Sequence, residues 1–200
     1  MGQVKYAAYF FIIFLSLSCG SAKNQNQFSQ TGSSTVNKNE EDTMAPSGKF
    51  AITSTAFKEG EMIPQKFTCD GQNISPPLKW ESVPAQTKSF ALIVDDPDAP
   101  AGTWVHWVIF NIPPTADELA ESVSTKSSLP SGALQGKNDF RDSGYGGPCP
   151  PGGTHRYYFK LYALDTMLKL SSGTTKPELL KAMEGHIVAQ THLMGRYSRK

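Results

Sequence analysis

Two segments of this chain combine residue types that suit the binding of a small anion. Each is a Pro- and Gly-rich loop that leads into an apolar run, and binding groups are often carried by loops that a rigid sheet holds in place. The candidate ligand-binding residues are Asp96, Pro97, Asp98, Trp104 and His106 in the first segment, and Gly147, Pro148, His155 and Tyr157 in the second.

A phosphate or carboxylate group needs hydrogen-bond donors without a fixed negative charge at their centre. Two imidazoles, the Tyr157 phenol and backbone N–H groups at glycines are donors of this kind. We expect Asp96 to orient one imidazole and to favour its charged form, because an adjacent carboxylate compensates the positive charge. Trp104 and the proline-rich loop would form the apolar wall of a small-ligand site.

Taken singly, each of these residues also has a structural explanation. Asp-Pro-Asp is a common turn sequence, and a single histidine at the start of a strand is usually part of a hydrogen-bonded framework. His186 and His192 are spaced so that they do not share a helix face, and we interpret both as structural or solvated. Taken alone, none of these residues establishes a site.

Other functional classes find less support in the sequence. It has no helical His-x-x-x-His and no Cys-x-x-Cys, which argues against a metal site, and no Gly-x-Ser-x-Gly that would carry a nucleophile. The formal net charge of +1 provides no field for nucleic acid. We therefore expect a non-enzymatic protein with no catalytic residue, no metal and no cofactor.

The elements that must position the candidate site are mainly strands. Near-continuous apolar runs rich in β-forming residues indicate a sheet that is covered on both faces. The runs cover residues 50–57, 90–94, 106–112 and 156–164. In the run over 156–164, Tyr157, Phe159, Leu161 and Ala163 alternate with residues of the opposite face.

One helix is expected near the C-terminus. Thr174 or Thr175 can cap it, Pro177 suits its first turn, and Glu178 suits the positive helix end. Apolar residues from Leu179 onward recur at spacings of three to six, and the pattern extends through Ile187 and Leu193 to a closing glycine, Gly195. The fold class is therefore mostly β, a single domain with a C-terminal α-helix.

Residues 123–154 show almost no periodicity and are interrupted by glycines. A loop of this length in a compact domain is usually functional. Because it ends at the segment that carries His155, we interpret it as part of the site.

The N-terminus predicts export. Lys5 precedes an apolar run from Tyr6 to Leu17, which would span only about 18 Å as a helix and is therefore typical of a signal peptide. Ser18-Cys19-Gly20 resembles a bacterial lipobox, although Ser16 stands where a large aliphatic residue is usual. We predict a signal peptide over residues 1–19 and a lipidated Cys19; a conventionally cleaved secreted form and an uncleaved anchor are the alternatives.

Residues 20–48 are polar, with too few apolar side chains to offset the entropy of ordering, and predict a disordered tether. Such a coil spans about 30 Å, enough to hold a domain away from a membrane. The folded domain should cover residues 49–200. Because Gly20 follows the cysteine, we expect a membrane-anchored lipoprotein of the outer membrane or periplasmic face.

Six collinear motifs resemble those of the phosphatidylethanolamine-binding protein family, also called the Raf kinase inhibitor protein family, in its bacterial and archaeal branch. Besides the two segments above, the motifs are Phe67 to Leu78, Gly132 to Gly136, Asn138 to Phe140, and Met183 to His186. The resemblance implies a large central sheet with a smaller sheet on one face, helices near the C-terminus, and an anion pocket at the sheet's edge formed by the nine candidate residues.

The resemblance also implies the kinds of partner. The ligand would be phosphate-like or a phospholipid head group, and the alternative function is a protease inhibitor or envelope scaffold that acts through protein–protein contacts. Cys69 and Cys149 remain once Cys19 is assigned to lipid. An exported domain permits a disulfide between them, and two buried free thiols are the other interpretation.

Overall fold

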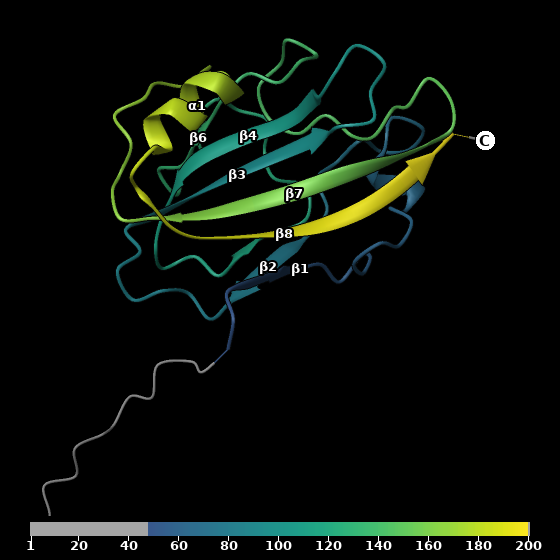
Figure 1. The fold of residues 1–200 in the computed structure, drawn as a ribbon. Coiled ribbons are helices and arrows are strands. Elements are labelled where there is room, and N and C mark those ends of the chain that lie inside the picture. The colour runs from purple at the N-terminus through teal and green to yellow at the C-terminus, as the bar shows by residue number, and fades with distance from the viewer. Residues whose placement is uncertain (1–47, 200) are drawn as a thin grey trace, which may run out of the picture. The chain divides into compact units, whose positions relative to one another are not determined.

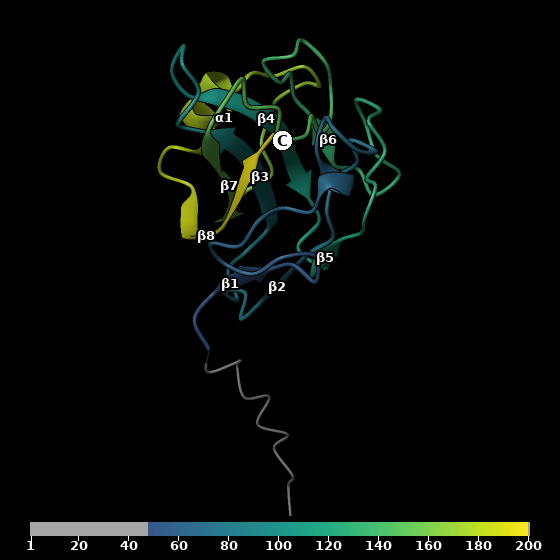
Figure 2. The same cartoon turned by 90° about the vertical axis from the view of Figure 1, so that its right-hand side faces the viewer.

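The computed structural model describes residues 48–199, which form two antiparallel sheets and one helix (Figures 1 and 2). The expected signal peptide, Cys19 and nearly all of the expected tether lie outside the described residues. The small sheet has the order β1-β2-β5 and the large sheet the order β6-β4-β3-β7-β8. The small-sheet strands are β1 (Ala51–Thr53), β2 (Leu78–Glu81) and β5 (Glu118–Leu119).

The large sheet contains the long strands of the fold. Its members are β6 (Leu134–Gln135), β4 (Trp104–Ile112), β3 (Ser89–Asp96), β7 (Thr154–Leu164) and β8 (Ile187–Ser198). A 3-10 turn, η1 (Gln65–Phe67), and the helix α1 (Lys176–Met183) complete the elements. Within residues 48–199 no helix is long and apolar enough to cross a membrane.

The main core lies between the two sheets. Trp80 of the small sheet meets Phe90 of the large sheet edge to face, with ring centroids 5.3 Å apart, and Phe50 stacks on the same ring at 6.3 Å. The other face of the large sheet is covered by α1, whose Leu179 and Met183 are fully buried. Burial on both faces explains the continuous apolar run of β3, in which every residue is buried.

This architecture confirms the expected fold class, a mostly β domain with a large sheet, a smaller sheet on one face and one C-terminal helix. The predicted strands over residues 90–94, 106–112 and 156–164 are confirmed as β3, β4 and β7. The predicted alternation in β7 is also confirmed, because Tyr157, Phe159, Leu161 and Ala163 all face the core between the sheets. The predicted strand over 50–57 is shorter, since only Ala51–Thr53 pair with β2.

The predicted start of the helix is confirmed and its predicted end is wrong. Glu178 Oε2 accepts hydrogen bonds from the backbone N–H and the hydroxyl of Thr175, both at 2.8 Å, so Thr175 caps the helix. The helix ends at Met183, and the chain reverses at Gly185, whose φ of 77° suits glycine.

Beyond that turn the chain forms β8, which pairs with β7 along its length. Leu193, Gly195 and Tyr197 of β8 are buried and alternate with more exposed residues, which is a strand period, whereas Ile187 is exposed. An unpaired β7 edge offers a long row of backbone groups, and satisfying them outweighs the helical spacing of Ile187 and Leu193.

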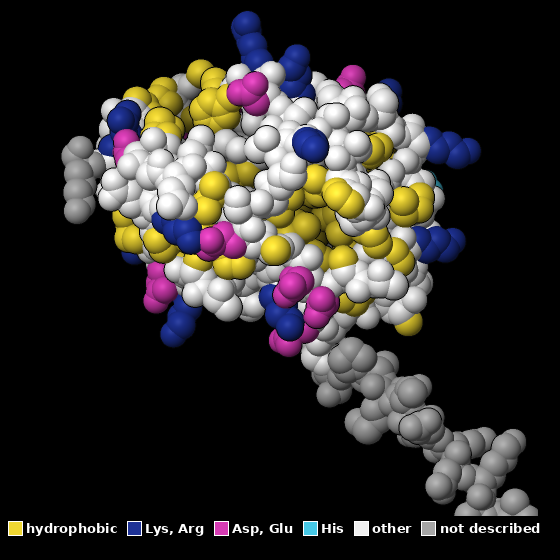
Figure 3. Space-filling model, turned by 180° about the vertical axis from the view of Figure 1, so that it is seen from behind, with side chains coloured by type: hydrophobic (Ala, Val, Ile, Leu, Met, Phe, Trp, Pro, Cys, Tyr) yellow, Lys and Arg dark blue, Asp and Glu magenta, His cyan; other side chains and the backbone are white. Residues whose placement is uncertain are grey.

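Charged side chains of both signs are dispersed over the face of the domain seen in Figure 3, around a hollow with hydrophobic walls. On that face Lys and Arg form no continuous patch.

Candidate ligand-binding site

The candidate site lies where the inner faces of β3, β4 and β7 end. Asp96 follows Val94 on the core-facing side of β3, and His155 precedes Tyr157 on the core-facing side of β7. The core-facing residues of β3 end with the carboxylate of Asp96, and those of the antiparallel β7 begin with the imidazole of His155. Strand periodicity therefore directs both polar side chains to one place.

A β-bulge brings His106 to the same place. Val94 pairs with Trp107 and Asp95 with Val105, so the pairing of β3 with β4 skips His106. Without the bulge His106 and Trp107 would face opposite sides of the sheet. With it Trp107 is in the core between the sheets while His106 lines the cavity, as expected of a bulge that redirects a side chain next to a functional site.

These residues line a cavity of about 340 Å³. Of the predicted site residues, Asp96, Trp104, His106 and His155 line it. The remaining walls are mostly apolar and come from three loops. They are formed by Ala99, Pro100 and Ala101 after β3, by Phe140, and by Cys149, Pro150 and Pro151 before β7.

At the inner end of the cavity Asp96 holds His155. The Asp96 Oδ2 atom lies 2.7 Å from His155 Nδ1, and its Oδ1 atom accepts a hydrogen bond from the backbone N–H of Asp98 at 2.8 Å. Both residues are buried, with exposed fractions of 3% and 7%. Since both carboxylate oxygens are engaged, Asp96 orients the imidazole, as predicted, and His155 Nε2 is left for a ligand.

His106 is held in a different way. Its Nδ1 donates to the carbonyl oxygen of Gly146 at 2.7 Å, and its ring lies edge to face with Phe140 and Tyr157. Burial lowers the pKa of His106, although the Gly146 carbonyl and the Asp96 carboxylate act in the opposite direction. At neutral pH this imidazole is therefore uncharged.

Tyr157 is placed less directly than predicted, whereas Trp104 lies in the cavity wall as expected. Tyr157 lies behind His106, and its buried hydroxyl has no hydrogen-bond partner among residues 48–199. Burial and the Asp96 charge raise its pKa. Trp104 forms the wall with Phe140, at 5.5 Å between ring centroids, and its indole nitrogen is likewise buried without a partner among the described residues.

Asp98 and Pro97 do not line the cavity, and Pro97 is exposed. Asp98 accepts hydrogen bonds from the backbone N–H, Nε and Nη2 of Arg156, the residue next to His155. The hydrogen bonds from Arg156 lower the pKa of Asp98 to about 2. The Asp-Pro-Asp segment therefore links β3 to β7 on both sides of the site, and only its first carboxylate reaches the cavity.

The N–H group of Gly147, which we expected to face an anion, is used within the protein, as is that of its neighbour Gly146. Gly146 N–H donates to the His106 carbonyl at 2.9 Å, and Gly147 N–H donates to Asn73 Oδ1 at 2.7 Å. Gly147 is needed for close approach instead, because a Cβ there would lie 2.5 Å from the Phe67 carbonyl oxygen. Pro148 likewise does not line the cavity; its carbonyl accepts from the Cys69 N–H.

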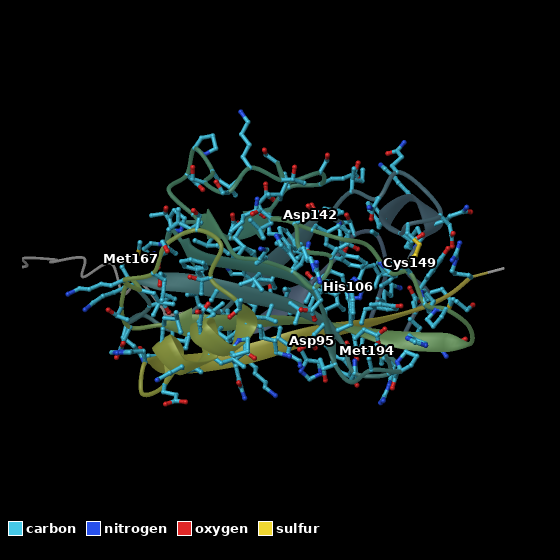
Figure 4. All side chains as sticks on the ribbon, turned by 90° about the horizontal axis from the view of Figure 1, so that it is seen from above. Asp95, His106, Asp142, Cys149, Met167 and Met194 are labelled. Carbon is cyan, nitrogen blue, oxygen red and sulfur yellow. A yellow bond between two sulfur atoms is a disulfide. The ribbon has the colours of Figure 1, made fainter. Side chains whose placement is uncertain are left out.

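A disulfide joins Cys69 to Cys149 across the loops at the cavity, with Cα atoms 5.4 Å apart (Figure 4). Cys149 itself lines the cavity, so the bond connects the η1 segment to the cavity wall. Of the two interpretations of these cysteines, the structure has the disulfide.

Several lining residues were not singled out from the sequence. Phe140, which is 40% exposed, contacts both Trp104 and His106, and an exposed aromatic residue in a glycine-rich loop was a usable signal. Ala99 and Ala101 carry no such signal, since small residues in a loop have no characteristic chemistry. No three His, Cys, Asp or Glu side chains of residues 48–199 are grouped closely enough to hold a metal ion.

Known proteins are similar to this chain in sequence and in fold. The family model described as phosphatidylethanolamine-binding protein matches residues 53–198. A protein of Methanothermobacter thermautotrophicus named UPF0098 protein is 56% identical over 148 residues, which cover 74% of this chain and 98% of the relative.

Solved structures show the same likeness. A crystal structure of CT736 from Chlamydia trachomatis, described as a putative phosphatidylethanolamine-binding protein homolog, matches with a TM-score of 0.70 and 45% identity, covering 76% of this chain and 98% of that one. The structure of E. coli YbcL, described as a new member of the mammalian family, matches with a TM-score of 0.72 and 37% identity over 76% of this chain and all of YbcL.

The chain therefore belongs to the phosphatidylethanolamine-binding protein family. It is a ligand-binding protein of that kind, and the resemblance seen in its motifs is confirmed.

Proposed function

We propose that this chain is a non-enzymatic binding protein whose cavity holds the phosphate or carboxylate group of a small ligand. The observation that supports this most directly is the pair His106 and His155, which come from different strands and line one small cavity. Apolar walls around a few convergent polar groups are typical of small-ligand sites. Imidazoles held through Nδ1 are oriented in advance, which lowers the entropy cost of binding.

The experiment that tests this proposal is calorimetric titration of inorganic phosphate into the wild type and His155→Ala. We expect the variant to lose phosphate binding and to remain folded, because His155 lines the cavity and is not a member of either apolar core cluster. His186→Ala is a matched control, since His186 is exposed and bonded to Asp165, far from the cavity lining. Equal phosphate affinity of the wild type and His155→Ala would show that His155 is not part of the binding site.

We infer that the protein is not an enzyme from the chemistry of the same cavity. Its polar groups are two imidazoles and a carboxylate whose oxygens are both engaged, and its lining residues include no serine, threonine or lysine nucleophile. Turnover of any ester, phosphoester or peptide substrate that is lost in His155→Ala would contradict this inference.

We propose further that the mature protein is anchored through a lipidated Cys19. Each buried CH₂ contributes about 0.8 kcal/mol, so several acyl chains hold a protein firmly at a membrane. Cys19→Ser should leave the precursor uncleaved or release the protein into the soluble fraction. Mass spectrometry of the mature N-terminus decides the matter: a free amine at Gly20 or beyond, without acyl mass, would show a simply secreted protein.

A further inference from the structure

The two imidazoles of the cavity are held through the same ring atom by partners of different charge. His155 Nδ1 lies 2.7 Å from the Asp96 carboxylate, and His106 Nδ1 lies 2.7 Å from the Gly146 carbonyl oxygen. A carbonyl oxygen accepts and cannot donate, and an ionised carboxylate does the same. Each Nδ1 therefore carries a proton, and each Nε2 is the atom left to meet a ligand.

The charge of each partner decides what Nε2 can do. Behind His155 stands a carboxylate, whose negative charge suits a ring that donates from Nε2 to an anion. Behind His106 stands a neutral carbonyl, and the ring is only 3% exposed. Burial lowers the pKa of His106, so at neutral pH its Nε2 bears a lone pair and acts as an acceptor.

The other groups near His106 do not change this assignment. The Gly147 backbone, Asp96 on β3 and Asp139 in the 123–154 loop also favour the charged form of His106, and burial outweighs all of them, so the pKa is lowered. Tyr157 and Phe140 face the ring edge to face. Among residues 48–199 no donor is hydrogen-bonded to His106 Nε2. A ligand must therefore bring the hydrogen that this atom accepts.

We propose that the cavity selects oxyanions that carry an O–H group of their own, such as hydrogen phosphate and singly protonated phosphomonoesters, over oxyanions that carry none, such as sulfate and phosphodiesters. This inference rests on the proposed function, because it concerns the same cavity. His155 Nε2–H donates to a charged oxygen of the ligand, and the ligand's O–H donates to His106 Nε2. The two imidazoles thus bind different oxygens of the same ligand: His155 binds a charged oxygen, and His106 binds the protonated one.

In an oxyanion without an O–H group, the oxygen that faces His106 Nε2 is an acceptor, as Nε2 is, so no hydrogen bond can form between them. Binding then either leaves a buried acceptor without a partner, which costs about 1–3 kcal/mol, or requires His106 to take up a proton. The phosphate of an intact phospholipid is a diester without an O–H group. The cavity consequently favours free phosphate or the head of a phosphomonoester over an intact phospholipid head group.

Phosphate and sulfate provide a matched test, because at pH 7.5 both are mainly tetrahedral dianions and only phosphate retains an O–H. Calorimetric titration of the full chain at matched ionic strength should show phosphate binding about tenfold more tightly than sulfate. Titration in two buffers with different heats of ionisation should show that sulfate binding takes up more protons than phosphate binding. Methyl phosphate should likewise exceed dimethyl phosphate near pH 6, where about half of the monoester retains its second proton.

Two variants separate selectivity from affinity. His106→Asn keeps an amide N–H for the Gly146 carbonyl and lacks Nε2, so the ratio of phosphate to sulfate affinity should fall to about one. His155→Asn keeps an N–H for Asp96 and loses the donor to the ligand, so both affinities should fall while the ratio is retained.

The wild-type titrations decide the outcome even if a variant fails to fold. Equal binding of the two anions at pH 7.5, or tighter binding of sulfate, overturns the selectivity and leaves the proposed function standing. Binding of neither anion at millimolar concentration overturns both. A preference for phosphate that persists in His106→Asn would assign the selectivity to another group and overturn the role given to His106.

Discussion

Two neighbouring carboxylates at the end of β3 face opposite sides of the large sheet and have different partners. Asp96 faces the cavity, where His155 is its partner. Asp95 faces the side of α1, is fully buried, and lies within ion-pair distance of Lys160 on β7 and Lys176 at the start of the helix. Figure 4 shows Asp95 beside the helix, with His106 on the other side of the sheet.

The difference shows how a partner assigns a role to the same side chain. Asp95 lies between two ammonium groups, so its ion pairs join β3 to β7 and to the helix. Asp96 has one imidazole as its partner, and because that imidazole also lines the cavity, the Asp96 pair is within reach of a ligand. One strand end therefore contributes to ion pairing with the helix on one face and to the proposed binding site on the other.

Loss of the Cys69–Cys149 disulfide, on the cavity side of the sheet, should have the largest effect on stability. The double substitution Cys69→Ser and Cys149→Ser should lower the free energy of unfolding by about 4 kcal/mol, because the disulfide closes a loop with a sequence separation of 80. Phosphate affinity should fall as well, since Cys149 lines the cavity. Chemical denaturation and calorimetry measure the two effects, with reduced wild type as the control. A variant as stable as the oxidised wild type would contradict the prediction.

On the helix side, Asp95→Asn should lower the free energy of unfolding by about 2 kcal/mol and leave phosphate affinity unchanged. Breaking a buried ion pair usually costs about 3–5 kcal/mol, and the loss is smaller here because both lysines retain contact with water. Lys176→Met is the matched control, since Lys160 still compensates Asp95 and the loss should be smaller. A marked drop in phosphate affinity in Asp95→Asn would show that the two faces are coupled.

On the cavity side, Asp96→Asn should have the opposite profile. The amide no longer compensates a charged His155, so phosphate affinity should fall about tenfold, while stability changes less than in Asp95→Asn. Calorimetric titration together with urea denaturation of both variants tests the crossed pattern. If Asp96→Asn is the less stable and the better binder, the comparison drawn from β3 is wrong.

The smallest effect concerns Asp98, next to the cavity. Its pKa is lowered from 3.8 to about 2 by Arg156, so the native state is stabilised above about pH 4 and loses this contribution as the pH falls towards 2. This stabilisation of the native state is small because Arg156 is half exposed. Unfolding of wild type and Asp98→Asn between pH 2 and pH 6 should differ more at the upper end. Parallel curves would contradict the role of Arg156.

Local patterns in the sequence were sufficient for several parts of the fold. Apolar runs identified β3, β4 and β7, and the alternation in β7 correctly placed Tyr157 and Phe159 on one face. Thr175 and Glu178 identified the helix start, because a capping box involves only neighbouring residues. The same reasoning failed at Ile187 and Leu193. Their spacing suits a helix, but this segment pairs with the long edge of β7 and forms a strand.

The sequence by itself also determined the main members of the cavity, because Asp96, Trp104, His106 and His155 lie in motifs that the family shares. Only the tertiary structure decided how they act. The bulge that places His106 depends on the register between two strands, and the partners that hold the rings, the Gly146 carbonyl for His106 and the Asp96 carboxylate for His155, lie at least forty residues away. Such partners are chosen by strand register and burial, which depend on the whole sheet and leave no local pattern, so the difference between a donor and an acceptor imidazole arises only in the folded protein.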